Sequence, residues 1–293
     1  MNLEYTFSPD ANPAVSQLAT HKKVMYAVKR WLSERTKTSG HVFGEEQLLH
    51  GKINQIVSLR GSDVESTNSI YQVRLDNGEQ GIFKPASWKR KEGYNDIPNR
   101  TLFKRERAAY IVDSLLDFDL VPPTIIRRIR GRIGSLQQYI SGEIPKRNQT
   151  HPFPETPRIL EQIPYEQRYM LWLFDYITCN ADRGSKGYSE NIIIKDGRLH
   201  AIDNGLTFGN NFMVLVEEFY NKPVPEIILD KLEAFISDSR KRLVLRSELS
   251  RLLPQDQINA CEARIVHIYN VLKRDRCIKD GSQLLFAPNI ETS

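Results

Sequence analysis

The sequence has little of what marks exported or membrane-spanning proteins. Its three cysteines are an odd number and lie far apart in the chain, which argues against a disulfide framework and a CxxC metal site. No apolar run approaches the ~20 residues that a membrane-spanning helix needs. The first residues, MNLEYTFSPDANPAV, are acidic and polar where a Sec signal peptide has a basic end and an apolar stretch. We therefore expect a cytoplasmic protein without a transmembrane segment, with delivery by a non-Sec route left open.

Repeats and low-complexity segments are absent too, so solenoids and long linkers are not expected. The chain has 293 residues, of which 40% are hydrophobic and 26% charged, as in ordinary globular proteins of one large domain or two packed lobes. Its net charge of +5 favours anionic partners such as a nucleotide or phospholipid headgroups. The basic clusters at 89–91 and 127–132 are short, and no nucleic-acid partner is expected.

The first half of the chain carries the pattern of a small antiparallel sheet. Five segments in which β-branched residues alternate or cluster are predicted strands: 53–59, 70–75, 80–84, 124–130 and 133–140. Asp76-Asn77-Gly78 supplies a turn between the second and third strands. Apolar residues at helical spacing predict one helix over 101–116, which ends before Pro122-Pro123.

The second half is predicted to be mainly helical. A polar, proline-containing stretch over 141–157 separates it from the sheet. Three helices and a hairpin that turns on Asp196-Gly197 are expected, in the order 165–178, 191–202, 226–237 and 255–273. The sequence thus predicts an α+β fold of three parts: an N-terminal helical extension at 1–45 with a helix near 22–34, a small antiparallel β lobe with one helix at 46–142, and a larger, mainly helical lobe at 143–293.

The stretch over 174–208, FDYITCNADRGSKGYSENIIIKDGRLHAIDNGLTF, carries the strongest chemical signal. It places Asp182 in a loop after a buried helix and puts Asn191 and Asp203 at the two ends of the predicted hairpin. Because the ends of an antiparallel hairpin lie side by side, these two oxygen ligands suit Mg²⁺ or Mn²⁺ bound together with phosphate and water. A surface ion pair between Asp182 and Arg183 and a plain turn at 203–205 are the structural alternatives.

Lys84 is the candidate cation for a bound phosphate. It ends an apolar strand, and Glu106 lies on the apolar side of the next helix, where an unpaired carboxylate is costly. A Lys84–Glu106 pair would satisfy this carboxylate and hold the ammonium over nucleotide phosphates, while Asp182 orients an attacking hydroxyl. The alternative is a surface glutamate that pairs locally with Lys104 or Arg107.

The loop between the first two predicted strands lacks the glycines that are typical of a phosphate-binding loop. Residues 60–69 contain a single glycine and no GxGxxG pattern. Backbone N–H groups and hydroxyls, that of Ser62 among them, could still hold phosphates, but Asp63 and Glu65 would repel them. Ser62 is the expected nucleotide contact in this loop, and Ser66, Thr67 and Ser69 are the alternatives.

The order Lys84, Glu106, Asp182, Asn191 and Asp203 resembles that of the protein kinase superfamily. The motifs GIFKP, RERAAYIVDSLL followed by LVPPT, and NADRG…NIII…AIDNGLTF resemble the phosphatidylinositol 3-/4-kinase-like group. Within it, type II phosphatidylinositol 4-kinases and their bacterial relatives are the most similar, and HipA-like and Fam20-like kinases are more distant. The resemblance covers roughly residues 50–240. The cysteine-rich palmitoylation cluster of the type II lipid kinases is missing.

This resemblance implies a two-lobed protein kinase-like fold and a role for each matched residue. Lys84 would bind the α- and β-phosphates of ATP, and Glu106 would orient it. Asp182 would be the catalytic aspartate, and Asn191 and Asp203 would bind the metal. Adenine would lie against the end of the last small-lobe strand. Its implied contacts are Tyr139, Ile140 and Ser141.

The leading hypothesis is an ATP- and Mg²⁺-dependent kinase that transfers the γ-phosphate to a hydroxyl group, with a protein Ser/Thr slightly preferred over an inositol lipid. A lipid acceptor would require a basic or apolar membrane-facing surface, which Trp88 and the cluster at 89–91 favour. A nucleotidyl (AMP) transferase on the same frame is a second enzymatic alternative. The non-enzymatic alternative is a pseudokinase that acts as a binding module, and the acidic loop at 60–69 supports it.

Overall fold

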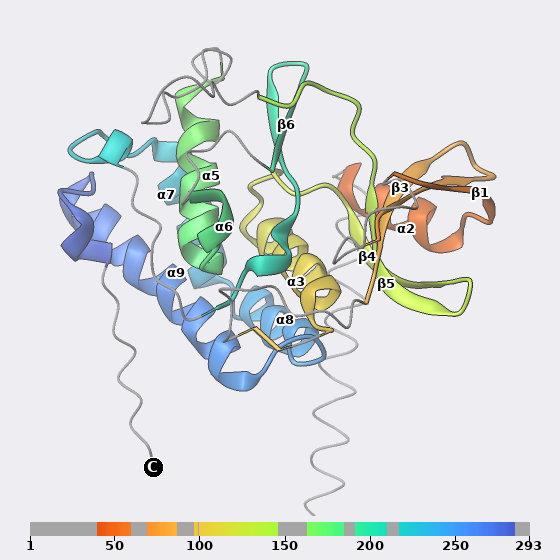
Figure 1. The fold of residues 1–293 in the computed structure, drawn as a ribbon. Helices are drawn as coiled ribbons and strands as arrows, with labels where there is room; N and C mark the ends of the chain where they lie inside the picture. The colour runs from red at the N-terminus through yellow and green to blue at the C-terminus, as the bar shows by residue number, and fades with distance from the viewer. Residues whose placement is uncertain are drawn as a thin grey trace, which may run out of the picture.

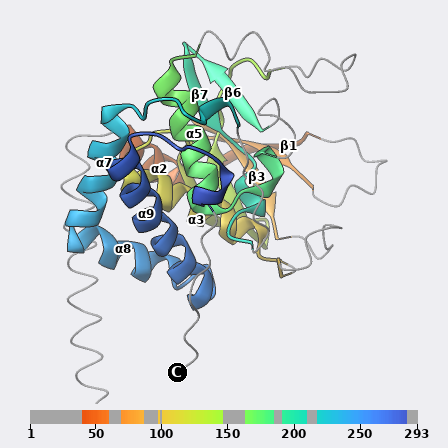
Figure 2. The same cartoon turned by 90° about the vertical axis from the view of Figure 1, so that its left-hand side faces the viewer.

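A β sheet and a larger group of helices form two lobes, which lie side by side in Figure 1, while in Figure 2 the helices lie in front of the sheet. The computed structural model describes residues 40–59, 69–86, 97, 98, 100–145, 163–184, 191–209 and 217–284. Several expected features lie outside the described residues: the helix near 22–34, Ser62 with the loop at 60–68, and Trp88 with the cluster at 89–91. The α+β fold class with two lobes, predicted from the sequence, is confirmed.

The small lobe is an antiparallel sheet with the strand order β1-β2-β3-β5-β4. Its strands are β1 (Ile53–Ser58), β2 (Tyr71–Leu75), β3 (Gln80–Pro85), β4 (Thr124–Ile129) and β5 (Arg132–Gln138). All five predicted strands are present, and the predicted helix between the third and fourth is α3 (Leu102–Leu116). Because successive side chains of a strand point to opposite sides, each face of the sheet has its own partner.

One face of the sheet is apolar and the other carries Lys84. The apolar face forms a cluster with α2 (Gly40–His50) whose members are Leu48, Val73, Leu75, Phe83, Ile125, Ile129 and Leu136. Residues that pair across strands share a face, so Lys84 lies beside Ser135 of β5 on the opposite side. There its side chain meets α3. The sheet therefore separates its own core from the side on which the candidate chemistry lies.

Helix α2 is not predicted by the sequence, and it runs across residue 45, where we expected the N-terminal extension to end. Its sequence, GHVFGEEQLLH, has two glycines and little amphipathic pattern, so periodicity cannot reveal it. Contacts with the sheet stabilise it. Leu48 is completely buried, and Arg127 of β4 donates hydrogen bonds to the carbonyl oxygens of Leu48 (2.6 Å) and Gly51 (2.7 Å). The helix therefore depends on tertiary contacts rather than on propensity.

The large lobe is built around α5 (Tyr165–Thr178), of which residues 169–178 are all buried. The predicted bounds of α5 and α7 (Glu226–Ser237) are those of the structure, and α9 (Gln255–Asp275) is slightly longer than predicted. The remaining elements are α6 (Ala181–Gly184), β6 (Ile192–Lys195), β7 (Arg198–Ala201), α8 (Ser239–Leu249), and the 3-10 helices η1 (Asn204–Leu206), η2 (Glu217–Phe219) and η3 (Gly281–Leu284). Helix α8 begins with the basic run SRKR, and the sequence does not predict it.

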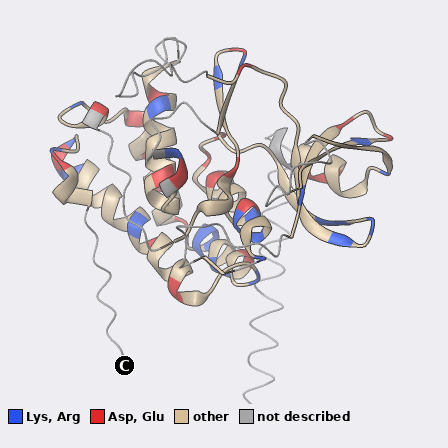
Figure 3. Ribbon diagram, viewed as in Figure 1, with Lys and Arg blue, Asp and Glu red and all other residues tan. Residues whose placement is uncertain are grey.

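Charged residues of both signs occur in both lobes (Figure 3). Among the helices of the described ranges, none combines the length and the hydropathy that crossing a bilayer requires.

One buried carboxylate holds the loop at 117–123, which follows α3. Asp113 has no exposed surface and accepts hydrogen bonds from the backbone N–H groups of Leu120 (3.2 Å) and Val121 (3.1 Å). The carbonyl oxygen of Leu120 in turn accepts a hydrogen bond from the N–H of Ala201 in β7 (2.8 Å). Asp113 therefore fixes the loop that attaches α3 to the large lobe.

Asp113→Ala should lower the free energy of unfolding by about 2–3 kcal/mol, because two buried N–H groups lose a charged acceptor. Urea unfolding followed by circular dichroism measures this loss. Asp230→Ala removes an exposed carboxylate of α7 and is the matched control, with an expected change below about 0.5 kcal/mol. Equal unfolding midpoints for the two variants would contradict the role given to Asp113.

Candidate active site

The chain passes from the sheet to the large lobe through residues 139–143, which we call the hinge segment. Tyr139 continues the pairing of β5, because its N–H donates to the carbonyl oxygen of Gln80 (2.9 Å). Glu143 then pairs with Ile194 of β6 through two backbone hydrogen bonds of 2.8 Å. Gly142 is required between them, since a Cβ there would lie 2.4 Å from the carbonyl oxygen of Ile194. The hinge segment therefore holds the β6–β7 hairpin close to the end of the sheet.

Lys84 lies on the face of the sheet that meets α3, and it contacts two carboxylates. Its Nζ is 2.6 Å from Oε1 of Glu106 in α3 and 2.8 Å from Oδ1 of Asp203, which follows β7. The exposed fraction of the side chain is 3% at Glu106, 21% at Lys84 and 52% at Asp203. The ion pair expected between Lys84 and Glu106 is thus present. Arg107, an alternative partner of Glu106, is bonded to Glu45 instead (2.9 Å).

The three charges at this point depend on one another. Burial alone would lower the pKa of Lys84, but the carboxylates of Asp203 and Glu106 raise it well above its usual value, so the ammonium stays protonated. Burial raises the pKa of Glu106, and the negative charge of Asp203 adds to this effect while Lys84 opposes it. Glu106 therefore needs Lys84 in order to remain ionised.

Asn191 and Asp203 lie at the open end of the β6–β7 hairpin. The sequence placed them at the two ends of the predicted hairpin, and the structure has them just outside its strands, before Ile192 and after Ala201. The N–H of Ile202 donates to the carbonyl oxygen of Asn191 (3.0 Å), which closes this end of the hairpin. Both residues have a left-handed backbone, with φ of 62° at Asn191 and 54° at Asp203, and this conformation ends the strands. Asn and Asp tolerate it better than most residues.

Asp182 reaches the same end of the hairpin from α6. The side-chain amide of Asn191 donates from Nδ2 to Oδ2 of Asp182 (3.1 Å). The N–H of Asp182 donates to Oδ1 of Asn180 (3.2 Å), which fixes the first turn of α6. Asp182 is buried, not on the surface as the ion-pair alternative required. The structure therefore gathers the five predicted residues into two hydrogen-bonded groups, one around Lys84 and one between Asp182 and Asn191.

Arg183, which the sequence indicated only as a surface partner of Asp182, holds these groups in place. Its completely buried guanidinium bonds to the carboxylate of Asp175 in α5 (2.9 Å) and to the side chain of Asn204 (2.6 Å). It also donates to the carbonyl oxygens of Asn191 (2.8 Å) and Ile202 (3.1 Å). Burial raises the pKa of Asp175, and Arg183 opposes this rise. A charged residue inside the apolar α5 was the available signal, because a buried carboxylate needs a buried cation.

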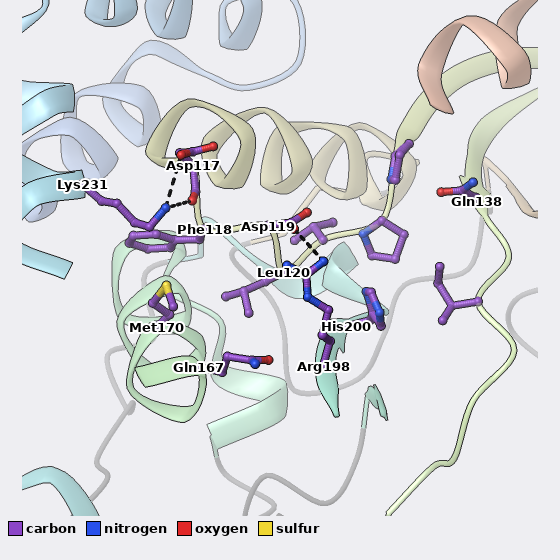
Figure 4. Close-up of a pocket in the computed structure, with 14 residues that line it drawn as sticks. Asp117, Phe118, Asp119, Leu120, Gln138, Gln167, Met170, Arg198, His200 and Lys231 are labelled. Carbon is purple, nitrogen blue, oxygen red and sulfur yellow. Dashed lines mark hydrogen bonds and ion pairs between the residues drawn. The ribbon is translucent and has the colours of Figure 1, made fainter. Parts of the chain in front are cut away.

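The expected adenine contacts belong to the hinge segment, but their side chains point to different sides. In an extended chain, alternate residues face opposite ways, so Tyr139 faces away from Gln138 and Ile140. Gln138 and Ile140 line a cavity of about 590 Å³ whose other walls come from the loop at 117–123, α5, β7 and Lys231 of α7 (Figure 4). Tyr139 is 40% exposed, and Ser141 is exposed. Contacts of these residues with adenine stay a prediction.

Two residues beside Lys84 were not singled out by the sequence. Ile82 of β3 and Gln137 of β5 pair with each other and share the face of Lys84, between it and the hinge segment. Ile82 is half-buried, and Gln137 is buried and donates to Oγ1 of Thr124 (2.9 Å). An apolar side chain and a buried amide at this position suit a nucleotide base. The sequence could not show this, because it depends on the register of β3 against β5.

A divalent metal fits the donors at the hairpin end only in part. Among all the residues that the structure describes, there is no group of three or more His, Cys, Asp or Glu side chains that could hold a metal. The donors at hand are the carboxylate of Asp203 and the amide of Asn191, whose nitrogen is turned toward Asp182. Mg²⁺ takes few protein oxygens and completes its shell with phosphate and water. The set therefore suits a metal that arrives with a nucleotide.

Comparison with known proteins gives distant relatives. No family model matches the sequence. Over 176 residues the chain is 28% identical to Protein Rv2133c of Mycobacterium tuberculosis, a match that covers 50% of this chain and 62% of that protein. The chain thus spans less than two thirds of this relative.

Solved structures are also similar to the chain. One is the Golgi casein kinase with Mn/ADP bound, with a TM-score of 0.46 and 14% identity over 77% of this chain and 74% of that one. Another is hydra Fam20 with sugar, with a TM-score of 0.46 and 14% identity over 78% of this chain and 87% of that one.

Lys84→Met should destabilise the protein by about 3 kcal/mol, because Glu106 keeps a buried carboxylate without its cation. Burial raises the pKa of Glu106, and without Lys84 only the hydrogen bond from the N–H of Asn204 opposes that rise, so the folded variant binds a proton more tightly than the unfolded chain. A raised pKa in the folded state favours folding at low pH and disfavours it at high pH. The stability deficit should therefore shrink between about pH 8 and about pH 5, as measured by urea unfolding.

The double variant Lys84→Met/Glu106→Gln is the matched control. It removes both charges and leaves an amide that does not titrate, so its deficit relative to the wild type should not change over the same pH range. If the deficit of Lys84→Met proves equally independent of pH, then Glu106 does not rely on Lys84 for its charge.

Proposed function

We propose that this chain is an ATP-dependent phosphotransferase of the protein kinase-like type, which transfers the γ-phosphate of ATP to a hydroxyl group. The observation that carries this proposal is the position of Lys84 in the sheet, whose ammonium joins Glu106 of α3 (2.6 Å) to Asp203 after β7 (2.8 Å). Protein kinases hold a strand lysine against a helix glutamate and a metal-binding aspartate in the same way. Burial of Glu106 and the left-handed backbone of Asp203 add support, because both are costly unless the site needs them.

In the proposed reaction, the bond between the γ-phosphorus and the β-phosphate oxygen breaks, and a bond from the same phosphorus to the acceptor oxygen forms. Asp182 accepts the proton of the acceptor hydroxyl, and ADP leaves. Lys84 contacts the phosphates, and Glu106 orients it. A divalent metal held by Asn191 and Asp203 would neutralise phosphate charge. Arg183 holds Asn191 and the neighbours of Asp203 in register through its bonds to the hairpin ends.

For the acceptor, we propose a protein Ser or Thr in preference to an inositol lipid. The sequence has three cysteines, of which Cys179 and Cys261 are buried, so it offers no cluster for acylation on a membrane. An inositol-lipid acceptor remains the alternative that the proposed test must separate.

The test is incubation of the full chain with Mg²⁺ and ATP that is labelled on either the α- or the γ-phosphate. Acceptors are the protein itself, a generic Ser/Thr protein substrate and vesicles that contain phosphatidylinositol. We expect γ-label on protein, located by mass spectrometry, and a loss of roughly 10²–10⁴-fold in Asp182→Asn. Asp203→Ala should abolish the rise in melting temperature that Mg²⁺ and ATP cause together, without unfolding the protein, because its side chain is half-exposed.

Asp230→Ala, with an exposed carboxylate remote in sequence from the site, serves as the activity control and should match the wild type. Transfer of α-label would identify a nucleotidyl transferase instead. Nucleotide binding without transfer of either label would identify a pseudokinase. Wild-type activity in both Asp182→Asn and Asp203→Ala would refute the site itself.

A further inference from the structure

The β4–β5 hairpin ends in a cluster of arginines that the proposed reaction does not use. Residues 124–138 contain four arginines and no Asp or Glu. Arg127 is engaged with α2, as described above. The other three, which we call the arginine tip, are exposed: Arg128, Arg130 and Arg132. Figure 3 shows the end of this hairpin in blue, with no red beside it among the residues that the structure describes.

The partners of the arginine tip are neutral. Arg128 donates to the carbonyl oxygen of Gly131 (2.7 Å), and Arg132 donates to the hydroxyl of Tyr71 (3.0 Å) and lies 5.7 Å from the centre of its ring. Within the described part of the chain, no carboxylate forms an ion pair with any of the three. Three exposed arginines of the large lobe differ in this respect, because each forms an ion pair with an Asp or Glu: Arg240, Arg274 and Arg276.

The backbone conformation of the turn also indicates that the charge of Arg130 serves binding. Both central residues have positive φ, 46° at Arg130 and 77° at Gly131. Hairpin turns of this kind favour Asn, Asp or Gly at the first position, because a longer side chain is strained there. Arginine at this place costs stability, and among the described residues it forms no hydrogen bond or ion pair that would offset the cost. Such strain is commonly retained where a residue serves binding.

We propose that the arginine tip binds the anionic surface of a lipid membrane. A guanidinium matches phosphate and carboxylate groups with a fork of donors, and three of them on a protruding turn can meet a flat layer of charged headgroups together. Leu59, 50% exposed, follows Ser58, which pairs with Tyr71, so an apolar side chain lies at the same end of the sheet. Single-stranded nucleic acid would need aromatic rings on which bases stack, and Arg132 covers that of Tyr71.

The position of the arginine tip determines which end of the sheet would face the membrane. Within β5, Arg132 lies at the end opposite to the hinge segment, and Ser135, the partner of Lys84, lies between them. A membrane held by the tip therefore lies at the end of the sheet remote from the hinge segment. This binding is independent of the phosphate transfer proposed above, and its test does not require turnover.

The test is cosedimentation of the full chain with phosphatidylcholine vesicles that either contain or lack phosphatidylserine. We expect binding only to the vesicles with phosphatidylserine, and weaker binding as salt is added. The variant Arg128→Gln/Arg130→Gln/Arg132→Gln should bind them roughly 100-fold more weakly, from the usual contribution of a basic residue near an anionic membrane. Arg128→Gln/Arg130→Gln keeps the contact of Arg132 with Tyr71 and should show an intermediate loss.

The matched control is Arg240→Gln/Arg274→Gln/Arg276→Gln, which removes the same net charge from arginines that are paired with carboxylates. It should bind like the wild type. The proposal fails if both triple variants lose affinity equally, since net charge alone would then explain binding. It also fails if the tip variant binds phosphatidylserine like the wild type, or if the wild type binds single-stranded poly-uridylate but not the vesicles.

Discussion

The buried guanidinium of Arg183 is the constraint on which the candidate site depends. A charge with no exposed surface is tolerated only when every donor has an acceptor, and here the acceptors come from α5, both ends of the β6–β7 hairpin and η1. These bonds leave the hairpin ends one position relative to α6. The buried ion pair between Arg183 and Asp175 therefore keeps Asn191, Asp203 and Asp182 close together.

Much of the fold follows from local patterns in the sequence. Helices α5 and α7 have their predicted bounds because each carries a continuous apolar side that ends at a proline or a polar loop. The pairing of Lys84 with Glu106 could also be predicted, because a carboxylate among the apolar residues of α3 requires a cation and the preceding strand supplies one. In these cases one element, or two neighbours in the chain, contained the whole argument.

The remaining features depend on contacts between distant parts of the chain. Helix α2 has no clear period of its own and is stabilised by Arg127 and the sheet. Ile82 and Gln137 become neighbours of Lys84 through the register of β3 and β5, which no single segment specifies. The left-handed backbones of Asn191 and Asp203 make the strands of the hairpin slightly shorter than predicted. Each depends on partners that a reading of one segment at a time cannot supply.

The pairing of Glu143 with Ile194 has a consequence for motion between the lobes. Tyr139 is anchored to the sheet and Glu143 to the large lobe, so residues 140–142 are the pivot, and Gly142 has little room within it. Rotation about so short a pivot swings one lobe as a lever. A change of a few degrees there displaces the far end of the small lobe most, while the hinge end of the sheet stays nearly fixed.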